Sequence, residues 1–222
     1  MPRAPHLSIA GNSTSPDAVV LLLPGGTASS VAPVRAFDLA RLRMFPLGRS
    51  VLRAGHGRMV LATLRYSVRG WNGDLESPLP DARWALDQIG ERFGDLPIGL
   101  VGHSMGGRTA LRVANHVGRS ESPVSSVAAL APWLPPGESI ASIEPRLLLA
   151  HGTADRITDP AQTFALAERL EADGADVELV RFPGARHSMM FPAGPWHELV
   201  ADFMVRTLLA PVPDGPETQL QR

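Results

Sequence analysis

The sequence contains no cysteine, and this absence excludes several classes of functional site. Disulfides, thiolate ligands for a metal ion and a cysteine nucleophile all need a residue that the chain lacks. Lysine is also missing, so all 21 basic residues are arginines. A phosphate-binding glycine loop that ends in lysine is therefore excluded as well. The sequence shows no cluster of metal-ligating residues, and we expect neither a metal ion nor another cofactor.

The charge balance and the apolar runs exclude further classes of protein. The 21 basic and 22 acidic residues nearly cancel, whereas a nucleic-acid-binding protein usually carries a basic excess or a basic stripe. The longest apolar runs are far too short to span a bilayer. The segment Met1–Pro16 is polar and lacks the apolar stretch of a secretory signal. We therefore expect a cytoplasmic protein with a small-molecule substrate, no nucleic-acid partner and no membrane span. The sequence does not indicate its oligomeric state.

The length and the hydrophobic content suit one globular domain. The chain has 222 residues, of which 44% are hydrophobic, and no internal repeat or linker divides it. We expect a single domain over residues 1–222, with an ordered core from about residue 17 to 210. The final segment, 211–222, contains three prolines and few apolar residues, so we expect a flexible tail there.

Short apolar runs alternate with longer amphipathic stretches along the chain. Several runs are apolar at consecutive positions, as is typical of strands that are covered on both faces. The predicted strands are Ala18–Leu23, Met59–Leu64, Ile98–Val101, Val127–Leu130, Leu147–Ala150 and Val177–Arg181. The predicted helices are Pro46–Ala54, Pro80–Phe93, Met105–Val117, Pro160–Ala172 and Trp196–Leu209. The residues between 29 and 45 show no clear pattern.

This alternation predicts an α/β fold, a doubly wound and mostly parallel sheet with helices on both faces. The active site of such a sheet lies beyond the carboxyl ends of its strands. Functional residues should therefore stand directly after the apolar runs.

The segment Gly102-His103-Ser104-Met105-Gly106 fits the pattern G-x-S-x-G and stands between a predicted strand and a predicted helix. A nucleophilic serine on a sharp strand–turn–helix elbow has this context. Its glycines allow the strand and the helix to approach each other closely. The Met105 N–H, at the start of the helix, is then directed at a developing oxyanion.

A nucleophilic serine needs a base, and His187 is the best placed of the seven histidines. It follows the last predicted strand and precedes the last helix. His103 lies inside the elbow, where neighbouring side chains point away from the nucleophile, and His151 suits a structural role better.

Asp155 is the candidate for the acid that orients the base, because it follows the strand Leu147–Ala150 directly. Asp159 competes with it, but a residue just before Pro160 is better explained as a helix cap. The order Ser104, Asp155, His187 is the order of the α/β-hydrolase triad.

A second oxyanion donor should come from the loop after the first predicted strand, Leu23-Pro24-Gly25-Gly26-Thr27. Gly26 can present its N–H to a substrate without steric conflict, and Thr27 is the alternative. Four further residues stand near these positions as candidates for the substrate pocket, or equally for packing: Thr27, Trp71, Trp133 and Met189.

The four motifs LLLPGG (21–26), GHSMGG (102–107), HGTAD (151–155) and GARHS (184–188) make the chain resemble the α/β-hydrolase superfamily over nearly its whole ordered length. The connection Pro132–Pro145 is too short for a helical cap domain, so the chain is similar to small lidless esterases, acyl thioesterases and the dienelactone-hydrolase group. That last group usually carries a cysteine nucleophile, where this chain has Ser104.

The resemblance and the motifs together imply a serine hydrolase that cleaves a carboxylic ester through an acyl-enzyme on Ser104. An acyl thioesterase, or a biosynthetic acyltransferase or cyclase, would use the same residues. A ligand-binding protein with the hydrolase fold and little turnover is the alternative of another class.

Overall fold

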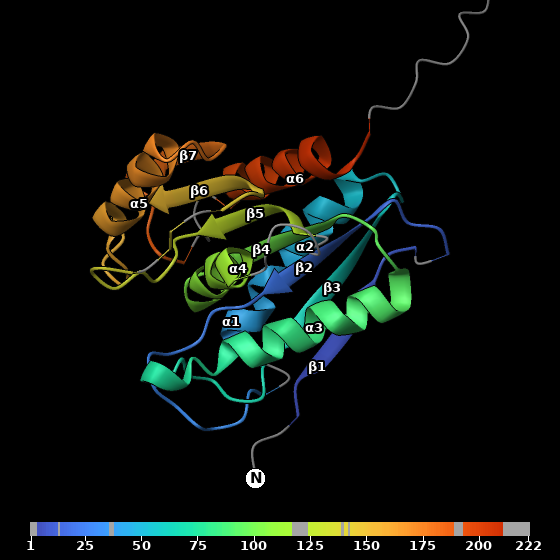
Figure 1. Cartoon of the computed structure of the whole chain (residues 1–222), viewed down its shortest axis with the longest axis horizontal. Coiled ribbons are helices and arrows are strands. Elements are labelled where there is room, and N and C mark those ends of the chain that lie inside the picture. Colours follow the sequence, from blue (N-terminus) through green and yellow to red (C-terminus); the bar gives the residue numbers. More distant parts are fainter. Residues whose placement is uncertain are drawn as a thin grey trace, which may run out of the picture.

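The computed structural model describes residues 4–12, 14–35, 38–116, 124–138, 140–141, 143–188 and 193–210. Its centre is a seven-stranded sheet in the order β1-β3-β2-β4-β5-β6-β7 (Figure 1). Strands β2 to β7 run parallel, and only β1 is antiparallel, against β3. The strands are β1 (His6–Ala10), β2 (Ala18–Leu23), β3 (Met59–Arg65), β4 (Ile98–His103), β5 (Val124–Leu130), β6 (Arg146–Gly152) and β7 (Val177–Phe182).

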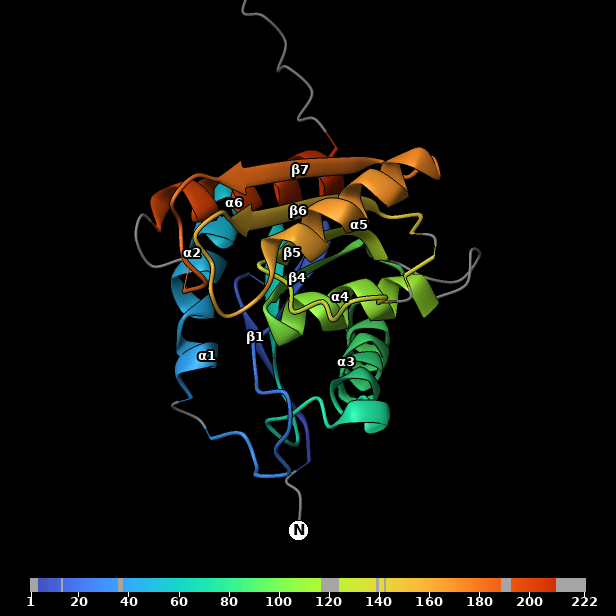
Figure 2. The ribbon, with the colours of Figure 1, turned by 90° about the vertical axis from the view of Figure 1, so that its left-hand side faces the viewer.

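Helices cover both faces of the sheet, which explains why the central strands β2, β3 and β4 are buried at every position. The helices are α1 (Leu39–Leu42), α2 (Met44–Ala54), α3 (Pro78–Phe93), α4 (Met105–His116), α5 (Pro160–Ala172) and α6 (Gly194–Leu208), with a short 3-10 turn η1 (Gly73–Leu75). One apolar core contains residues of α3, α4 and α5, and the other contains residues of α2 and α6. Figure 2 shows these two layers from the carboxyl ends of the strands. The predicted doubly wound, mostly parallel fold is confirmed.

The structure differs from the sequence-based expectation at the start of the chain. Strand β1 lies before residue 17, where we had placed the beginning of the ordered core, and it pairs with β3 from His6↔Arg65 to Ala10↔Leu61. Its residues are exposed or only half-buried, so this strand lacks the apolar run that identified the others.

The connection from β5 to β6 forms neither a helix nor a strand over the residues described there, 131–138, 140–141 and 143–145. The fold therefore has no cap domain in this connection, as the sequence predicted. Within the described part of the chain, none of the helices has the length and apolar character that a bilayer crossing requires. The expected flexible tail, 211–222, lies outside the described residues.

Candidate active site

Ser104 occupies the sharp turn between β4 and α4, at the carboxyl edge of the sheet. Its backbone φ is +57°, a left-handed conformation that is uncommon for a residue with a side chain. Three hydrogen bonds hold this turn in place. The Ser104 N–H donates to Leu130 O (2.9 Å), and the Ser104 carbonyl accepts from the N–H groups of Arg108 and Trp133 (both 3.1 Å). The strained backbone is thus fixed by β5, α4 and the loop after β5.

Two glycines permit the close approach of strand and helix around Ser104. A Cβ atom at Gly102 would collide with the carbonyl of Gly106, and one at Gly106 would collide with the carbonyl of Leu23. Any larger residue at either position would therefore push α4 away from β2 and β4.

The structure brings together the three residues that the sequence singled out for the triad. His187 Nε2 lies 3.0 Å from Ser104 Oγ, and His187 Nδ1 lies 2.8 Å from Asp155 Oδ2. Ser104 follows β4, Asp155 follows β6 and His187 follows β7, so the carboxyl ends of three parallel strands position the three residues. Because Asp155 accepts a hydrogen bond from Nδ1–H, the neutral ring leaves Nε2 free to accept the serine proton.

Five donors surround the Asp155 carboxylate. Oδ1 accepts the N–H groups of Ile157 (2.8 Å) and Thr158 (3.1 Å), and Oδ2 accepts from Thr158 Oγ1 (2.8 Å) and His151 Nε2 (3.1 Å) as well as from His187. Burial alone would raise the pKa of Asp155. The hydrogen bonds from Ile157, His187 and Thr158 outweigh that effect and hold the pKa at about 2. Asp155 is therefore a carboxylate at any neutral pH.

His151 is a second imidazole on the same carboxylate oxygen. The ring is fully buried, and its Nδ1 lies 2.8 Å from Thr163 Oγ1. Burial lowers the pKa of His151, although Asp155 opposes that shift. The neutral ring consequently donates Nε2–H to Asp155 and accepts the Thr163 hydroxyl at Nδ1. Sequence reasoning assigned His151 a structural role and missed its contact with Asp155.

His103, inside the elbow, supports the base rather than the nucleophile. Its Nε2 lies 2.9 Å from the His187 carbonyl, and the two rings are 4.8 Å apart between centroids. Burial is the main cause that lowers the pKa of His103 to about 3. The ring is therefore neutral, and because a carbonyl can only accept, its proton resides on Nε2.

The two predicted oxyanion donors, Gly26 and Met105, lie on either side of the elbow. A Cβ atom at Gly26 would collide with the Met105 side chain, so the two residues are in contact. The N–H groups of both residues have no acceptor among the described residues. The alternative donor, Thr27, gives its N–H to Arg69 O at 3.0 Å and is therefore occupied.

The pocket candidates divide into three groups. Trp71 is 2% exposed, and Arg108 lies over its ring at 3.8 Å. Trp133 is half-buried with its ring edge-on to Trp71 at 6.2 Å, so both tryptophans pack against α4. Thr27 lines a cavity beside the loop that follows β2. Met189 lies outside the described residues.

Asp159, the competitor of Asp155, caps α5. Its Oδ1 accepts the Ala161 N–H at 2.9 Å, and its backbone is extended, as at an N-cap. It makes no contact with His187 among the described side-chain hydrogen bonds.

Ser104, His187 and Asp155 have the geometry in which an imidazole removes a hydroxyl proton and a carboxylate stabilises the resulting imidazolium. No group of histidine, aspartate and glutamate side chains among the described residues is arranged to hold a metal ion.

Comparisons with family models place this site in a known fold. The model described as alpha/beta hydrolase fold matches residues 18–145, which is more than half of the chain. The model of the prolyl oligopeptidase family matches residues 115–210, the part that contains Asp155 and His187. No curated protein matches the chain by sequence.

Solved structures share the fold at low sequence identity. A serine hydrolase homologue from Coxiella burnetii has a TM-score of 0.69 at 15% identity, with 90% of this chain and 91% of that chain covered. A serine hydrolase without a lid from Xanthomonas campestris has a TM-score of 0.68 at 16% identity, covering 94% and 91%. A thermophilic esterase from the Planctomycetes species Thermogutta terrifontis has a TM-score of 0.67 at 20% identity, covering 94% and 92%. The matched family model and the agreement in fold lead to one conclusion: this chain belongs to the alpha/beta hydrolase fold family.

Proposed function

We propose that this protein is a serine esterase that hydrolyses small carboxylic esters through an acyl-enzyme on Ser104. His187 takes the hydroxyl proton as Ser104 attacks the ester carbonyl, and it then delivers that proton to the leaving alcohol. Water, activated by the same imidazole, releases the acid and restores the serine. The N–H groups of Gly26 and Met105 stabilise the oxyanion in both steps.

One observation carries the proposal, the continuous hydrogen-bond chain from Ser104 Oγ through His187 to Asp155 Oδ2 (3.0 and 2.8 Å). Two features of its surroundings support it. The positive φ of Ser104 presents the nucleophile at the N-terminal end of α4. The unoccupied N–H groups of Gly26 and Met105 lie beside it. Esterases among the structural neighbours are consistent with this chemistry.

The test compares wild type with Ser104→Ala on p-nitrophenyl acetate and butyrate. We expect the variant to lose activity by several orders of magnitude, because no other group can form the acyl-enzyme. A fluorophosphonate probe should label the wild type on Ser104 and leave the variant unlabelled. The circular dichroism spectrum of the variant checks that it is folded. Turnover by a well-folded Ser104→Ala protein would disprove the proposal.

The class of leaving group is the finer question. Parallel assays with p-nitrophenyl esters and acyl-CoA thioesters of the same acyl chains compare the two classes directly. We expect kcat/KM to be higher for the oxygen esters. A preference for thioesters would keep the roles of Ser104, His187 and Asp155 and change the assigned activity to that of a thioesterase.

A further inference from the structure

His151 is a buried imidazole beside the site that the mechanism does not use. It is the penultimate residue of β6, its side chain is fully buried, and α5 packs beside that strand (Figure 2). Its Nε2 atom lies 3.1 Å from both Asp155 Oδ2 and Thr158 Oγ1, and its Nδ1 atom lies 2.8 Å from Thr163 Oγ1. Both ring nitrogens therefore have polar partners, and the ring belongs to the hydrogen-bond network around Asp155.

Asp155 and Thr163 together determine which nitrogen of this ring carries the proton. A carboxylate can only accept, so the contact with Asp155 requires an N–H group at Nε2, and Nδ1 then accepts the Thr163 hydroxyl. The opposite tautomer would place the lone pair of Nε2 against the carboxylate. Thr163 is fully buried on α5, so this hydroxyl is held at the ring. Burial also lowers the pKa of His151, which keeps the ring neutral.

The bond from His151 shares one oxygen of Asp155 with the catalytic base. His187 Nδ1 lies 2.8 Å from Asp155 Oδ2, and the Thr158 hydroxyl donates to the same oxygen at 2.8 Å. Each donor stabilises the negative charge of the carboxylate. A carboxylate that already has several donors attracts a neighbouring imidazolium less strongly, so His151 weakens the hold of Asp155 on protonated His187.

The charged groups that act on His151, besides the orienting carboxylate, are His187 and, more weakly, Asp159 at the start of α5. On β7, Arg181 is the register partner of His151, and its guanidinium lies over the ring of Phe164 at 4.5 Å. That ring is edge-on to His151, with 6.4 Å between centroids. Strand β5, on the other side of β6, carries no charged residue. In the described part of the chain, the orienting carboxylate is thus the one charged group within hydrogen-bond distance of His151.

We propose that His151, held in its Nε2–H tautomer by Thr163, is a positioning residue of the esterase reaction. Through its bond to Asp155 it limits how strongly that carboxylate holds the His187 imidazolium, and it thereby extends the activity of the enzyme to lower pH. Among the described contacts His151 bonds to neither Ser104 nor His187, so it acts through Asp155. The inference rests on the proposed esterase function and adds a residue to its site.

The pH dependence of kcat/KM for p-nitrophenyl butyrate tests this role. In His151→Met the carboxylate loses one donor, so the protonated base is favoured and the acid limb of the profile should move to higher pH. We expect a shift of roughly 0.5–1 pH unit, which corresponds to the net strength of one hydrogen bond. A residue that merely filled space would change the rate or the melting temperature and leave the acid limb in place. His151→Gln, whose amide N–H can reach the position of Nε2, should restore the wild-type limb.

Thr163→Val tests the tautomer separately. Without the hydroxyl, Nδ1 has no donor, and the proton is free to move to that nitrogen. The acid limb should therefore shift in the same direction as in His151→Met, and by less. The matched control is Thr207→Val, which removes a hydroxyl that donates to the Phe203 carbonyl (2.8 Å) on α6, and it should keep the wild-type profile.

Circular dichroism verifies that each variant is folded. Where His151→Met is not, the double variant His151→Met/Thr163→Val takes its place, because it leaves no buried hydroxyl unpaired. Long-range proton–nitrogen NMR spectra of the histidine rings add a readout that needs no turnover. We expect one neutral wild-type ring that is protonated at Nε2 and is missing from the spectrum of His151→Met. The proton on His187 Nδ1 should change its resonance in His151→Met and keep it in Thr207→Val.

Two results would overturn the inference. The first is an acid limb that stays in place in a folded His151→Met protein. The second is a wild-type His151 ring that carries its proton on Nδ1. Failure of the proposed function is seen separately, as no hydrolysis of any ester. The resonance of the His187 Nδ1 proton then decides alone whether His151 acts on the base through Asp155.

Discussion

The hydrogen bonds around the carboxylate of Asp155 restrict this side chain to one role, that of an ionised acceptor. Donors from four residues meet its two oxygens, and three of the five bonds converge on Oδ2. This arrangement keeps the charge in place and fixes the side chain in one orientation. His187 therefore meets a preorganised acceptor, so little reorganisation is needed when the imidazolium forms.

Asp155→Asn should lower kcat for p-nitrophenyl butyrate by on the order of 10⁴-fold, as loss of the acid does in serine proteases. The carboxamide presents an N–H where His187 needs an acceptor, so the ring takes the wrong tautomer. Steady-state kinetics at neutral pH measure the effect, with circular dichroism as the check on folding. Loss of less than tenfold would show that Asp155 is not the orienting acid.

The lowered pKa of His103 leads to a separate prediction, about how the free energy of unfolding depends on pH. Its pKa is about 3 in the folded protein and about 6.5 in an unfolded chain. Between these values the unfolded state binds a proton that the folded state rejects, so stability falls as the pH is lowered from about 6.5 toward 3. The slope is roughly 1.4 kcal/mol per pH unit for one such group. Asp155, with its lowered pKa of about 2, loses its own contribution only below about pH 4.

Urea unfolding of His103→Gln between pH 4.5 and 6.5 measures this slope. The free energy of unfolding should depend less steeply on pH than in wild type, by roughly 1 kcal/mol per pH unit. His56→Gln, which replaces an exposed histidine, is the control and should keep the wild-type slope. Equal slopes in all three proteins would contradict the neutral, buried state of His103.

The residues that sequence reasoning located and those it missed differ in a physical way. Ser104, Asp155 and His187 each follow a recognisable apolar run, so the topology of a parallel sheet brings them to one edge. Thr158 has no such marker. It meets Asp155 through a turn of three residues, and no local pattern in the sequence encodes that contact.

At the scale of elements, α5 follows the Asp155 turn directly, and its first turn is defined by Asp159 and Pro160. Asp159 accepts the Ala161 N–H, and proline at the first helical position needs no acceptor. The cap therefore fixes where the helix begins. The loop that carries Asp155 is therefore anchored at both ends, by β6 before it and by the capped helix α5 after it.

Asp159→Ala should lower the free energy of unfolding by about 1 kcal/mol and the melting temperature by about 2–4 °C. Its kcat should stay within a few-fold of wild type, because Asp155 keeps all its donors. Differential scanning calorimetry and ester kinetics on the same preparation measure both quantities. A severe fall in kcat with an unchanged melting temperature would assign the orienting role to Asp159 instead.

The elements that the sequence predicted are those with both faces buried or with one clear apolar stripe. Strand β1 was missed because its apolar residues Leu7 and Ile9 alternate with polar or small residues over only five positions. The residues between β2 and α2 were also left unassigned, and they contain isolated bridges, Thr27↔Gly70 and Pro33↔Val68, with one short helix. These bridges depend on the loop after β3, some forty residues away, so no local pattern predicts them.

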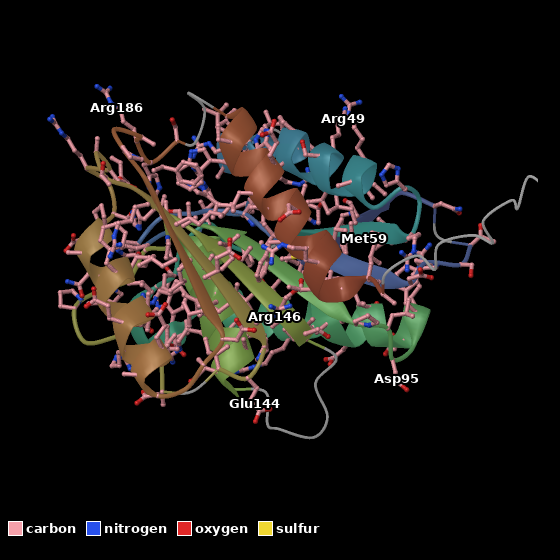
Figure 3. The ribbon with its side chains drawn as sticks, turned by 90° about the horizontal axis from the view of Figure 1, so that it is seen from above. Arg49, Met59, Asp95, Glu144, Arg146 and Arg186 are labelled. Carbon is pink, nitrogen blue, oxygen red and sulfur yellow. The ribbon has the colours of Figure 1, made fainter. Side chains whose placement is uncertain are left out.

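In the whole molecule, the connections that follow the carboxyl ends of strands carry the most exposed of the large apolar side chains in the described residues. The large hydrophobic residues that are most exposed in the described part of the chain are Val31, Leu39, Phe45, Leu75 and Ile157. All of them belong to segments that follow the carboxyl ends of strands. The opposite end of the sheet is marked by Met59 and Asp95, and the Ser104 end by Arg186 (Figure 3).

The described part of the connection from β5 to β6 holds no cap domain, so we expect catalysis to need no opening step. The initial rate with p-nitrophenyl butyrate, measured across its solubility limit, should rise hyperbolically and show no jump when droplets form. Contact with exposed apolar residues such as Val31, Leu75 and Ile157 should lower KM for longer acyl chains. The binding free energy should gain about 0.8 kcal/mol for each methylene that is buried. A sharp increase in rate confined to concentrations above the solubility limit would reveal a lid.

The strand that leads to His187 is also the least protected strand of the parallel part of the sheet. Strand β7 pairs with β6 alone among the described strands, and its residues are half-buried or exposed, whereas β2 and β4 are buried throughout. Local unfolding begins where few contacts oppose it. Fraying of β7 separates the base from a nucleophile that is still held by the core. Catalysis therefore depends on the stability of one edge rather than on that of the whole fold, and heat inactivation would precede the melting of the helices.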